Sequence, residues 1–365
     1  MMKRVGIITM YHNSENYGGI LQAYALAKKL NLLGADAKQI SFDACGSRVF
    51  APKKSIVTSV KTTMAKILKM LSAGNARKSK IIQKFRDDIP HTSVVNPDNI
   101  KSIVNDFDVF ITGSDQVWNP LAMCKEYLLS FVPPEKTKLS YAASISRDRL
   151  TGEEQAVFQN YLSTFTDISV RESHDVALLE ECVNKKIEWV LDPVFLLDQA
   201  EWEDAACKRL IEKPYVFCYF LNDKNKDAAL MKEFANQTNT VTVQIDGLTM
   251  SSKKMADQTI KNVGPRQFLS LIKHAEHVLT DSFHAMSFSF LFRKNFIVFP
   301  RNTERTMESR ITSFLQLLGR EDRFVDAKEV KVSELLALKP MDYNVSYQDF
   351  EERKAHSENF LKKYL

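Results

Sequence analysis

Residues 278–299 are the stretch that most limits how this 365-residue chain can fold. Residues 278–280 form a short apolar run that is typical of the end of a buried strand. Residues 285–292 are almost wholly apolar, so the helix that they predict is buried. Residues 295–299 predict the next strand. The segment therefore predicts a strand–turn–helix–strand unit.

Three polar side chains stand where this predicted helix begins: Asp281, Ser282 and His284. Asp and Ser cap helices well because a short side-chain oxygen can accept a free backbone N–H. A helix N-terminus also offers unpaired N–H groups and a positive dipole end, which suit a phosphate or carboxylate. An imidazole there is a candidate acid or anion ligand. The alternative, a satisfied histidine at a buried helix start, stays open.

The chain begins with the same succession of elements. Residues 5–10 predict a buried strand, residues 20–33 carry a helical apolar pattern, and residues 39–42 predict a second strand. A βαβ unit of this kind implies a parallel sheet. A glycine pair before the helix lets backbone approach a ligand closely, and a plain tight turn is the alternative, which this motif alone favours. The turn residues that we expect at a ligand site are Asn16, Tyr17, Gly18 and Gly19.

Polar residues also follow three later predicted strands, at residues 108–113, 139–145 and 168–170. Open α/β sheets bind ligands just past the carboxyl ends of their strands. Arg171 ends the last of these strands, and its guanidinium can hold a carboxylate or phosphate or can pair with Glu172 or another acid. The candidates in these loops are Gly113, Ser114, Asp115, Gln116, Ser144 and Arg171.

Two series of βα units predict two domains. Residues 198–214 are polar and helical and link the halves, and the second series starts with a strand at residues 215–221. The chain also exceeds the roughly 250–300 residues that one core usually supports. We expect an α/β fold of two Rossmann-like domains facing across a cleft. The expected parts are an N-terminal domain over 1–197 with a basic helical insertion at about 53–89, a C-terminal domain over 198–345, and a C-terminal helix over 346–365 that could pack back on the first domain.

The composition excludes several classes of protein. No apolar run reaches the roughly 18 residues that a transmembrane helix needs, and the N-terminus does not resemble a signal peptide. The five cysteines show no CxxC or CxxH spacing, which indicates reduced thiols in a cytoplasmic protein and no zinc site or disulfide framework. The net charge of +5 is modest. We expect no metal and no nucleic-acid partner.

Residues 53–80 contain eight Lys or Arg residues and no acidic residue. Within them, residues 56–71 predict an amphipathic helix with an apolar face, and Lys61, Lys66 and Lys69 lie off that face. One interpretation is a surface helix that covers its own domain. The other is a patch that contacts an anionic membrane or a polyanionic substrate.

An ordered set of motifs spans most of the chain and resembles the polysaccharide pyruvyl transferase family. The motifs are HNSENYGGILQAYAL, DVFITGSDQVWN, YAASIS, SVRES, VLDPVFLL, GPRQFLSLIKHAEHVLTDSFHA and the late SRI at residues 309–311. The resemblance implies a fold like that of the GT-B glycosyltransferases. It implies phosphoenolpyruvate as the donor and no further cofactor. The implied acceptor is a sugar of a bacterial surface polysaccharide or of its lipid-linked precursor.

The resemblance also implies roles for individual residues. The arginine of the SVR motif, here Arg171, contacts the donor. A second donor site, often Arg-Leu-His in the family, reads Ser282, Phe283 and His284 here, so the histidine is retained and the arginine is not. The cationic side chains that could replace it are Arg266, Arg293 and Arg310.

Ketal formation from phosphoenolpyruvate needs an acid near the methylene carbon and a base near the acceptor hydroxyl. His284 is the candidate for the acid or for holding the phosphate. Asp115 is the candidate base, and Asp281 is either a second candidate or a helix cap. Two other functions stay open: a GT-B-type glycosyltransferase that uses a nucleotide sugar, because a fold does not fix a function, and a non-catalytic family member.

Overall fold

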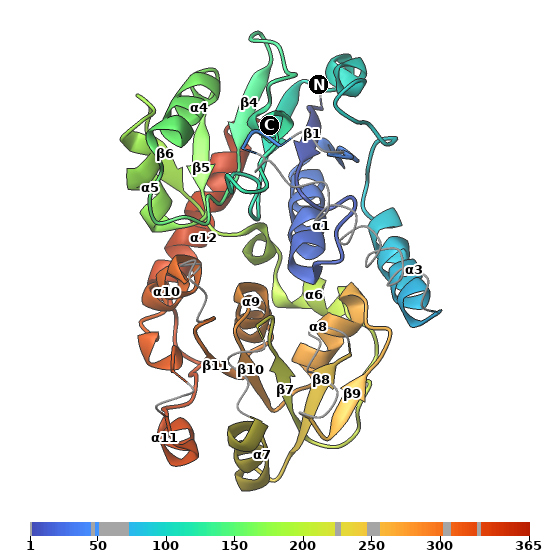
Figure 1. Cartoon of the computed structure of the whole chain (residues 1–365), viewed down its shortest axis with the longest axis vertical. Coiled ribbons are helices and arrows are strands. Elements are labelled where there is room, and N and C mark those ends of the chain that lie inside the picture. Colours follow the sequence, from blue (N-terminus) through green and yellow to red (C-terminus); the bar gives the residue numbers. More distant parts are fainter. Residues whose placement is uncertain are drawn as a thin grey trace, which may run out of the picture. The chain divides into compact units, whose positions relative to one another are not determined.

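The structure is a computed structural model that describes residues 2–44, 48–50, 73–222, 228–246, 256–301, 308–326 and 330–365 (Figure 1). The chain divides into two compact units. Unit 1 comprises Met1–Pro193 and Ser357–Leu365, and unit 2 comprises Val194–His356. The expected division at 197/198 lies close to the observed one, and the expected terminal segment 346–365 is shared between the two units. The basic helix predicted over residues 56–71 lies outside the described residues.

The sheet of unit 1 is parallel. Its four paired strands lie in the order β2-β1-β3-β4, and β5 pairs with β6. Isolated parallel bridges join Leu139 to Asp167 and Ala143 to Val170, which connects β4 to β5. The strands are β1 (Arg4–Ile8), β2 (Asp36–Gln39), β3 (Val109–Thr112), β4 (Thr137–Ser140), β5 (Ile168–Val170) and β6 (Ile187–Trp189).

Two further parallel bridges, from Gln39 to His91 and from Phe42 to Val95, add a segment beyond β2. With that segment as the third element, the strand order is that of the Rossmann fold, and the chain reverses its direction of winding between β1 and β3. Ligands of open α/β sheets bind at this switch point, outside the carboxyl ends of the strands.

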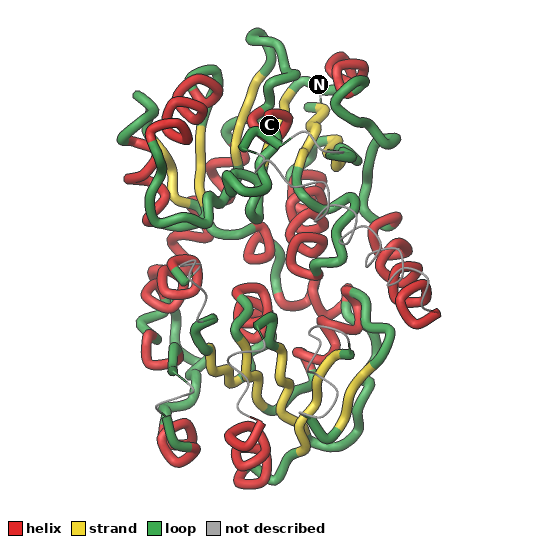
Figure 2. Tube along the Cα trace, in the orientation of Figure 1, coloured by secondary structure: helices red, strands yellow, loops and turns green. Residues whose placement is uncertain are grey.

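Helices connect these strands in the βα rhythm that the sequence predicted (Figure 2). Asn16 caps α1 by accepting the Gly18 N–H at 3.0 Å, and Thr151 and Glu154 form a capping box at the start of α4. The helices of unit 1 are α1 (Tyr17–Leu32), α3 (Ala73–Asp87), η1 (Ile100–Asp106), η2 (Lys125–Leu128), α4 (Gly152–Leu162) and α5 (Ser173–Glu180).

The sheet of unit 2 is also parallel, with the order β11-β10-β7-β8-β9. Read from the other edge, this is again the Rossmann order, and the switch point lies between β7 and β10. The strands are β7 (Tyr215–Tyr219), β8 (Val241–Ile245), β9 (Gln258–Ile260), β10 (His277–Thr280) and β11 (Asn295–Val298).

Helix α9 realises the buried helix predicted over residues 285–292. Its residues Phe283–Phe290 are all buried, and the Phe288 ring stacks edge-on against Trp202 at 4.8 Å between centroids. The remaining helices are η3 (Pro193–Leu196), α6 (Gln199–Ala205), α7 (Ala228–Gln237), α8 (Pro265–Lys273), α9 (Phe283–Leu291), α10 (Ser309–Leu317), η6 (Glu321–Arg323), α11 (Val332–Ala337) and α12 (Gln348–Lys362). In the part of the chain that the structure describes, no helix is long and apolar enough to span a membrane.

Candidate functional site

A hydrogen-bond network fixes the loops at the switch point of unit 1. The amide nitrogen of Gln22 donates to Thr9 Oγ1 at 3.0 Å and to the Gly19 carbonyl at 2.8 Å. Its amide oxygen accepts from the Ser114 backbone N–H at 3.2 Å, and the Thr9 hydroxyl donates to the Ser114 carbonyl at 3.1 Å. The first turn of α1 and the loops after β1 and β3 are therefore held together by one buried side chain.

Asp115 is the carboxylate that this loop carries. Its backbone has φ of +56°, and its carbonyl accepts from the Ser144 N–H at 3.1 Å. A Cβ at Gly19 would lie 3.1 Å from Asp115 Oδ2, so the absence of a side chain at Gly19 leaves room for the carboxylate. Gly113 has φ of +120°, and a Cβ there would lie 2.2 Å from the Tyr141 carbonyl. Only glycine permits the close backbone approach that places this loop.

Arg171 lies close to Asp115 and is surrounded by carboxylates. Its Nη1 is 2.9 Å from Asp192 Oδ2 and 3.9 Å from Asp115 Oδ1, and its Nε is 2.9 Å from Glu172 Oε1. The Arg171 side chain is 2% exposed. Burial alone would lower the pKa of Arg171, but the nearby carboxylates outweigh burial and the pKa is raised. The positive charge of the guanidinium is therefore compensated by carboxylates of the same unit.

Two hydroxyls connect this ion cluster to the neighbouring loops. The Ser114 hydroxyl donates to Asp192 Oδ2 at 3.2 Å, and the Ser144 hydroxyl donates to Glu172 Oε1 at 3.0 Å. The cluster thus joins the carboxyl ends of β3, β4, β5 and β6. Among the described residues, no three His, Cys, Asp or Glu side chains are grouped as metal ligands.

Asp175 borders the cluster in the first turn of α5. Its Oδ2 accepts from the Ile145 N–H at 3.1 Å, and the residue is 1% exposed. Burial, together with the negative charge of Glu172, raises the pKa of Asp175 well above its usual range. Asp175 therefore stays protonated at pH values at which a solvated aspartate is charged.

The switch point of unit 2 is organised by Asp281. Its two carboxylate oxygens accept from the Leu221 N–H at 2.7 Å and from the Asn222 N–H at 2.9 Å, which binds the loop after β7. Its backbone carbonyl accepts from Arg301 Nε at 3.0 Å, and Asn222 donates to the Arg301 carbonyl. The helix cap is Ser282, whose hydroxyl accepts from the Ala285 N–H at 3.4 Å. Asp281 is thus neither the cap of α9 nor an uncommitted base.

His284 lies in the first turn of α9, one residue after Phe283. Both residues are buried, with 6% and 3% exposure, and their rings stand edge-on at 5.2 Å between centroids. Arg310 lies at the start of α10 and is buried. The ring contact between Phe283 and Phe314, at 6.4 Å, brings α10 against the start of α9. Ser282, His284 and α10 therefore belong to one region of unit 2.

The other arginines weighed from the sequence lie elsewhere. Arg266 donates to the Ala205 carbonyl at 3.1 Å and so joins α8 to α6. Arg293 is exposed in the turn before β11, at the amino edge of the sheet and therefore at the opposite edge from His284. Arg301, which follows β11 at the carboxyl edge, was not singled out from the sequence. Its position just past the strand in VFPRN is the signal that could have identified it.

The outer turn residues of unit 1 have mixed environments. Asn16 is an exposed cap, whereas Tyr17 is buried and Lys78 Nζ lies 5.5 Å from its ring centroid. Gln116 is half-buried and accepts from Asn119 Nδ2 at 3.3 Å. Sequence reasoning missed several residues of the hydrogen-bond network and ion cluster of unit 1, among them Thr9 and two others. The two others are Gln22, which reads only as a helix residue, and Asp192, which reads as part of an Asp-Pro turn.

The sequence matches the family model described as polysaccharide pyruvyl transferase over residues 16–303. The chain belongs to this family. The match includes the loop that carries Asp115, the Arg171 cluster, and the turn from Asp281 to His284. A search of curated proteins by sequence returned no significant match.

Solved structures with the same fold are very distant in sequence. The UDP-GlcNAc 2-epimerase from Methanocaldococcus jannaschii matches with a TM-score of 0.58 and 13% identity, over 100% of this chain and 99% of that chain. A putative UDP-N-acetylglucosamine 2-epimerase from Listeria monocytogenes gives 0.52 and 10%, over 88% and 89% of the two chains. The UDP-N-acetylglucosamine 2-epimerase from Rickettsia bellii gives 0.50 and 10%, over 99% and 95%. These similarities and the two parallel sheets confirm the predicted α/β fold of two Rossmann-like, GT-B-type units.

In this polysaccharide pyruvyl transferase family member, the predicted site residues form one group in each unit. The group in unit 1 comprises Gly19, Gly113, Ser114, Asp115, Ser144 and Arg171. The group in unit 2 comprises Ser282, Phe283 and His284, with Arg301 added by the structure. Donor binding by Arg171 stays a prediction. The contacts of Arg171 with Glu172 and Asp192 hold neighbouring loops together.

Arg171→Met should destabilise the protein by about 3–5 kcal/mol, because it leaves Glu172 and Asp192 buried without their cation. Denaturant unfolding of the purified variant measures this change. Arg4→Met is the matched control, because it breaks an Arg–Asp pair with Asp108 that is exposed, and it should change stability little. A residue that served only as an exposed donor ligand would instead leave the unfolding free energy of Arg171→Met near that of wild type.

In Asp175→Asn, the free energy of unfolding should fall less steeply with rising pH than it does in wild type. Because the folded-state pKa of Asp175 is raised, the folded protein binds more protons than the unfolded chain above the usual pKa of aspartate, so stability falls as the pH rises. Asparagine keeps an acceptor for the Ile145 N–H but cannot ionise. Denaturant midpoints from about pH 5 to about pH 8 test this, with the exposed Asp98→Asn as control. Equal slopes for wild type and Asp175→Asn would contradict it.

Proposed function

We propose that this protein transfers the pyruvyl group of phosphoenolpyruvate to a sugar of a bacterial surface polysaccharide or of its lipid-linked precursor and forms a pyruvate ketal. The observation that carries the proposal is the family match over residues 16–303, which includes the two loops with the acid–base candidates. Phosphoenolpyruvate is a substrate in this scheme, and no further cofactor is required.

The reaction sets the groups that a site must supply. A proton adds to the methylene carbon, which leaves a cationic carbon at C2, and two sugar hydroxyls form bonds to that carbon. The bond from C2 to the phosphate oxygen breaks. Of the two hydroxyl protons released, one balances the proton taken up by the methylene carbon and the other leaves with phosphate. The site therefore needs an acid, a base and cationic or N–H donors for two anionic groups.

We assign donor binding to the start of α9 in unit 2. Helix N-termini bind anions, and here Ser282 begins the helix and His284 lies in its first turn. Arg301 supplies the cation that the family motif places at position 282. Its Nε holds the Asp281 carbonyl at 3.0 Å, so the guanidinium is tied to the residue just before Ser282. His284 is the acid or phosphate-holding group in this scheme, and the buried Arg310 on α10 supports the same region.

We assign activation of the acceptor hydroxyl to Asp115 in unit 1. A base must be held in place to be effective, and the Asp115 backbone is fixed by the Ser144 N–H while its carboxylate lies against the glycine at position 19. Arg171 Nη1 lies 3.9 Å from Asp115 Oδ1, so the guanidinium helps to hold this carboxylate in place. Arg171 is thus a positioning residue for Asp115 in this scheme, and a direct role on the donor is the alternative that its variants test.

Purified wild-type protein should release phosphate from phosphoenolpyruvate in the presence of one member of a panel of sugars and lipid-linked saccharides. His284→Asn and Asp115→Asn should each lose roughly 10²–10⁴ in turnover while remaining folded, because each removes one proton-transfer group. His174→Asn and Asp108→Asn, which change surface side chains of the same types, are the controls. Binding of nucleotide sugars without binding of phosphoenolpyruvate would favour a glycosyltransferase, and a folded protein that binds neither would favour a non-catalytic member.

Arg301→Ala should raise KM for phosphoenolpyruvate roughly 10- to 100-fold, because a hydrogen bond to a charged group contributes about 1.5–3 kcal/mol. Arg301→Lys should recover part of the loss, since it restores the charge without the planar fork. Arg293→Ala is the control, because that arginine is exposed at the opposite edge of the same sheet. Steady-state kinetics with varied phosphoenolpyruvate measure all three. An unchanged KM in Arg301→Ala would remove this residue from donor binding.

A further inference from the structure

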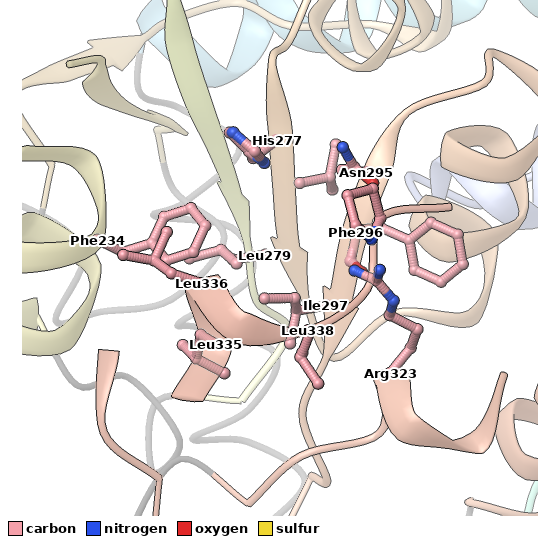
Figure 3. Close-up of a pocket in the computed structure, with 12 residues that line it drawn as sticks. Phe234, His277, Leu279, Asn295, Phe296, Ile297, Arg323, Leu335, Leu336 and Leu338 are labelled. Carbon is pink, nitrogen blue, oxygen red and sulfur yellow. The ribbon is translucent and has the colours of Figure 1, made fainter. Parts of the chain in front are cut away.

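A small cavity of about 80 Å³ lies at the amino edge of the unit 2 sheet. It adjoins His277 and Asn295, the first residues of β10 and β11, and it is closed by side chains from α7, η6 and α11 (Figure 3). The cavity extends along β10 and β11 as far as Leu279 and Ile297, and the candidate donor site lies beyond the carboxyl ends of these strands, at Asp281 and Arg301.

The walls of the cavity are mostly apolar. Figure 3 shows Phe234 on one side, Arg323 on the other, and leucine and isoleucine side chains between them. The His277 ring stands edge-on to Phe234 at 5.3 Å between centroids, and the Asn295 amide oxygen accepts from the Met341 N–H at 2.9 Å. The apolar lining comes chiefly from Phe234, Leu279, Ile297, Leu335 and Leu338.

Arg323 brings a positive charge into this apolar wall. The residue is 3% exposed, and its terminal nitrogens donate to the carbonyls of Phe296 and Lys339. Within the described ranges, its Nε makes no hydrogen bond. The neighbouring carboxylate, Asp322, lies 3.7 Å from Nε and is already held by Arg320 through contacts of 2.8 and 2.9 Å.

Two guanidinium groups therefore share one carboxylate, and the buried one has the poorer contact. Burial, followed by the charge of Arg320, lowers the pKa of Arg323 to about 10. A buried cation with incomplete compensation is costly unless an anion pairs with it. The burial of His277 lowers its pKa as well, so this imidazole does not add a second charge near neutral pH.

We propose that this cavity binds a small aliphatic monocarboxylate of about two to four carbon atoms. The carboxylate would pair with the Arg323 guanidinium, and the alkyl part would pack among the leucine side chains. The volume fits this class, since a cavity of roughly 150 Å³ holds benzene and this one is about half as large. Arg323 is the one arginine or lysine among the described residues that line the cavity, and its charge matches one negative charge. The apolar walls disfavour phosphate and sulfate, whose oxygens all need polar partners.

Propionate is the probe, and saturation-transfer NMR on the full-length protein at constant ionic strength measures its binding. The expected result is saturable binding with Kd on the order of millimolar, as suits so small a ligand. Binding of 1-propanol, which has the same size and no charge, should be at least tenfold weaker. Absence of saturable propionate binding would overturn the proposal and leave a cavity that holds water only.

Two variants locate the site. Arg323→Met removes the charge and should weaken propionate binding at least tenfold, but it changes a buried residue. Leu336 lines the cavity and is 39% exposed, so Leu336→Trp puts a larger side chain on the cavity wall at a position outside the buried core. It should weaken binding by a similar factor, whereas Leu210→Trp, at another exposed leucine of unit 2, should not. Propionate binding that persists unchanged in Leu336→Trp would overturn the proposal even if Arg323→Met does not fold.

Discussion

The buried ion cluster around Arg171 is the interaction on which the arrangement of unit 1 depends. A charge this far from water is stable only when it is matched, and Glu172 and Asp192 match it at 2.9 Å each. Those carboxylates in turn accept hydrogen bonds from the hydroxyls of Ser114 and Ser144. The carboxyl ends of β3, β4, β5 and β6 are therefore linked through one cation. Electrostatic compensation in this cluster therefore acts together with the Gln22 hydrogen bonds to fix the geometry of the loops.

The loops at the switch point of unit 2 are held together by backbone hydrogen bonds to one carboxylate, that of Asp281. The carboxylate oxygens of Asp281 accept backbone N–H groups of the neighbouring loop at 2.7 and 2.9 Å. Hydrogen bonds from backbone N–H groups to a carboxylate are charge-assisted, and here they tie the loop after β7 to the residue that follows β10. In both units an acidic residue just past a strand, Asp192 or Asp281, ties neighbouring loops together.

Local patterns in the sequence predicted the elements well and the partners of the polar residues poorly. Helix α9 could be predicted because an almost wholly apolar run of that length has few other solutions. The loops of the candidate site could be located because carboxyl ends of parallel strands share one edge. The pairing of Arg171 with Asp192, 21 residues away, could not be predicted, since nothing local specifies which acid meets a buried arginine. The contact of Arg301 with Asp281 could not be predicted for the same reason, because it exists only once the strands are paired.

Unit 1 is built from two separate stretches of the chain, and this has a consequence for its biosynthesis. The Leu191 N–H donates to the Ser357 hydroxyl at 2.9 Å, and the Phe360 ring packs 6.3 Å from the fully buried Tyr141. On the ribosome, the first 193 residues emerge long before these partners exist. Tyr141 then lacks its cover and the Leu191 N–H lacks its acceptor while all of unit 2 is synthesised. The N-terminal unit is thus the first to start folding and cannot be completed until the last residues of the described chain have left the ribosome.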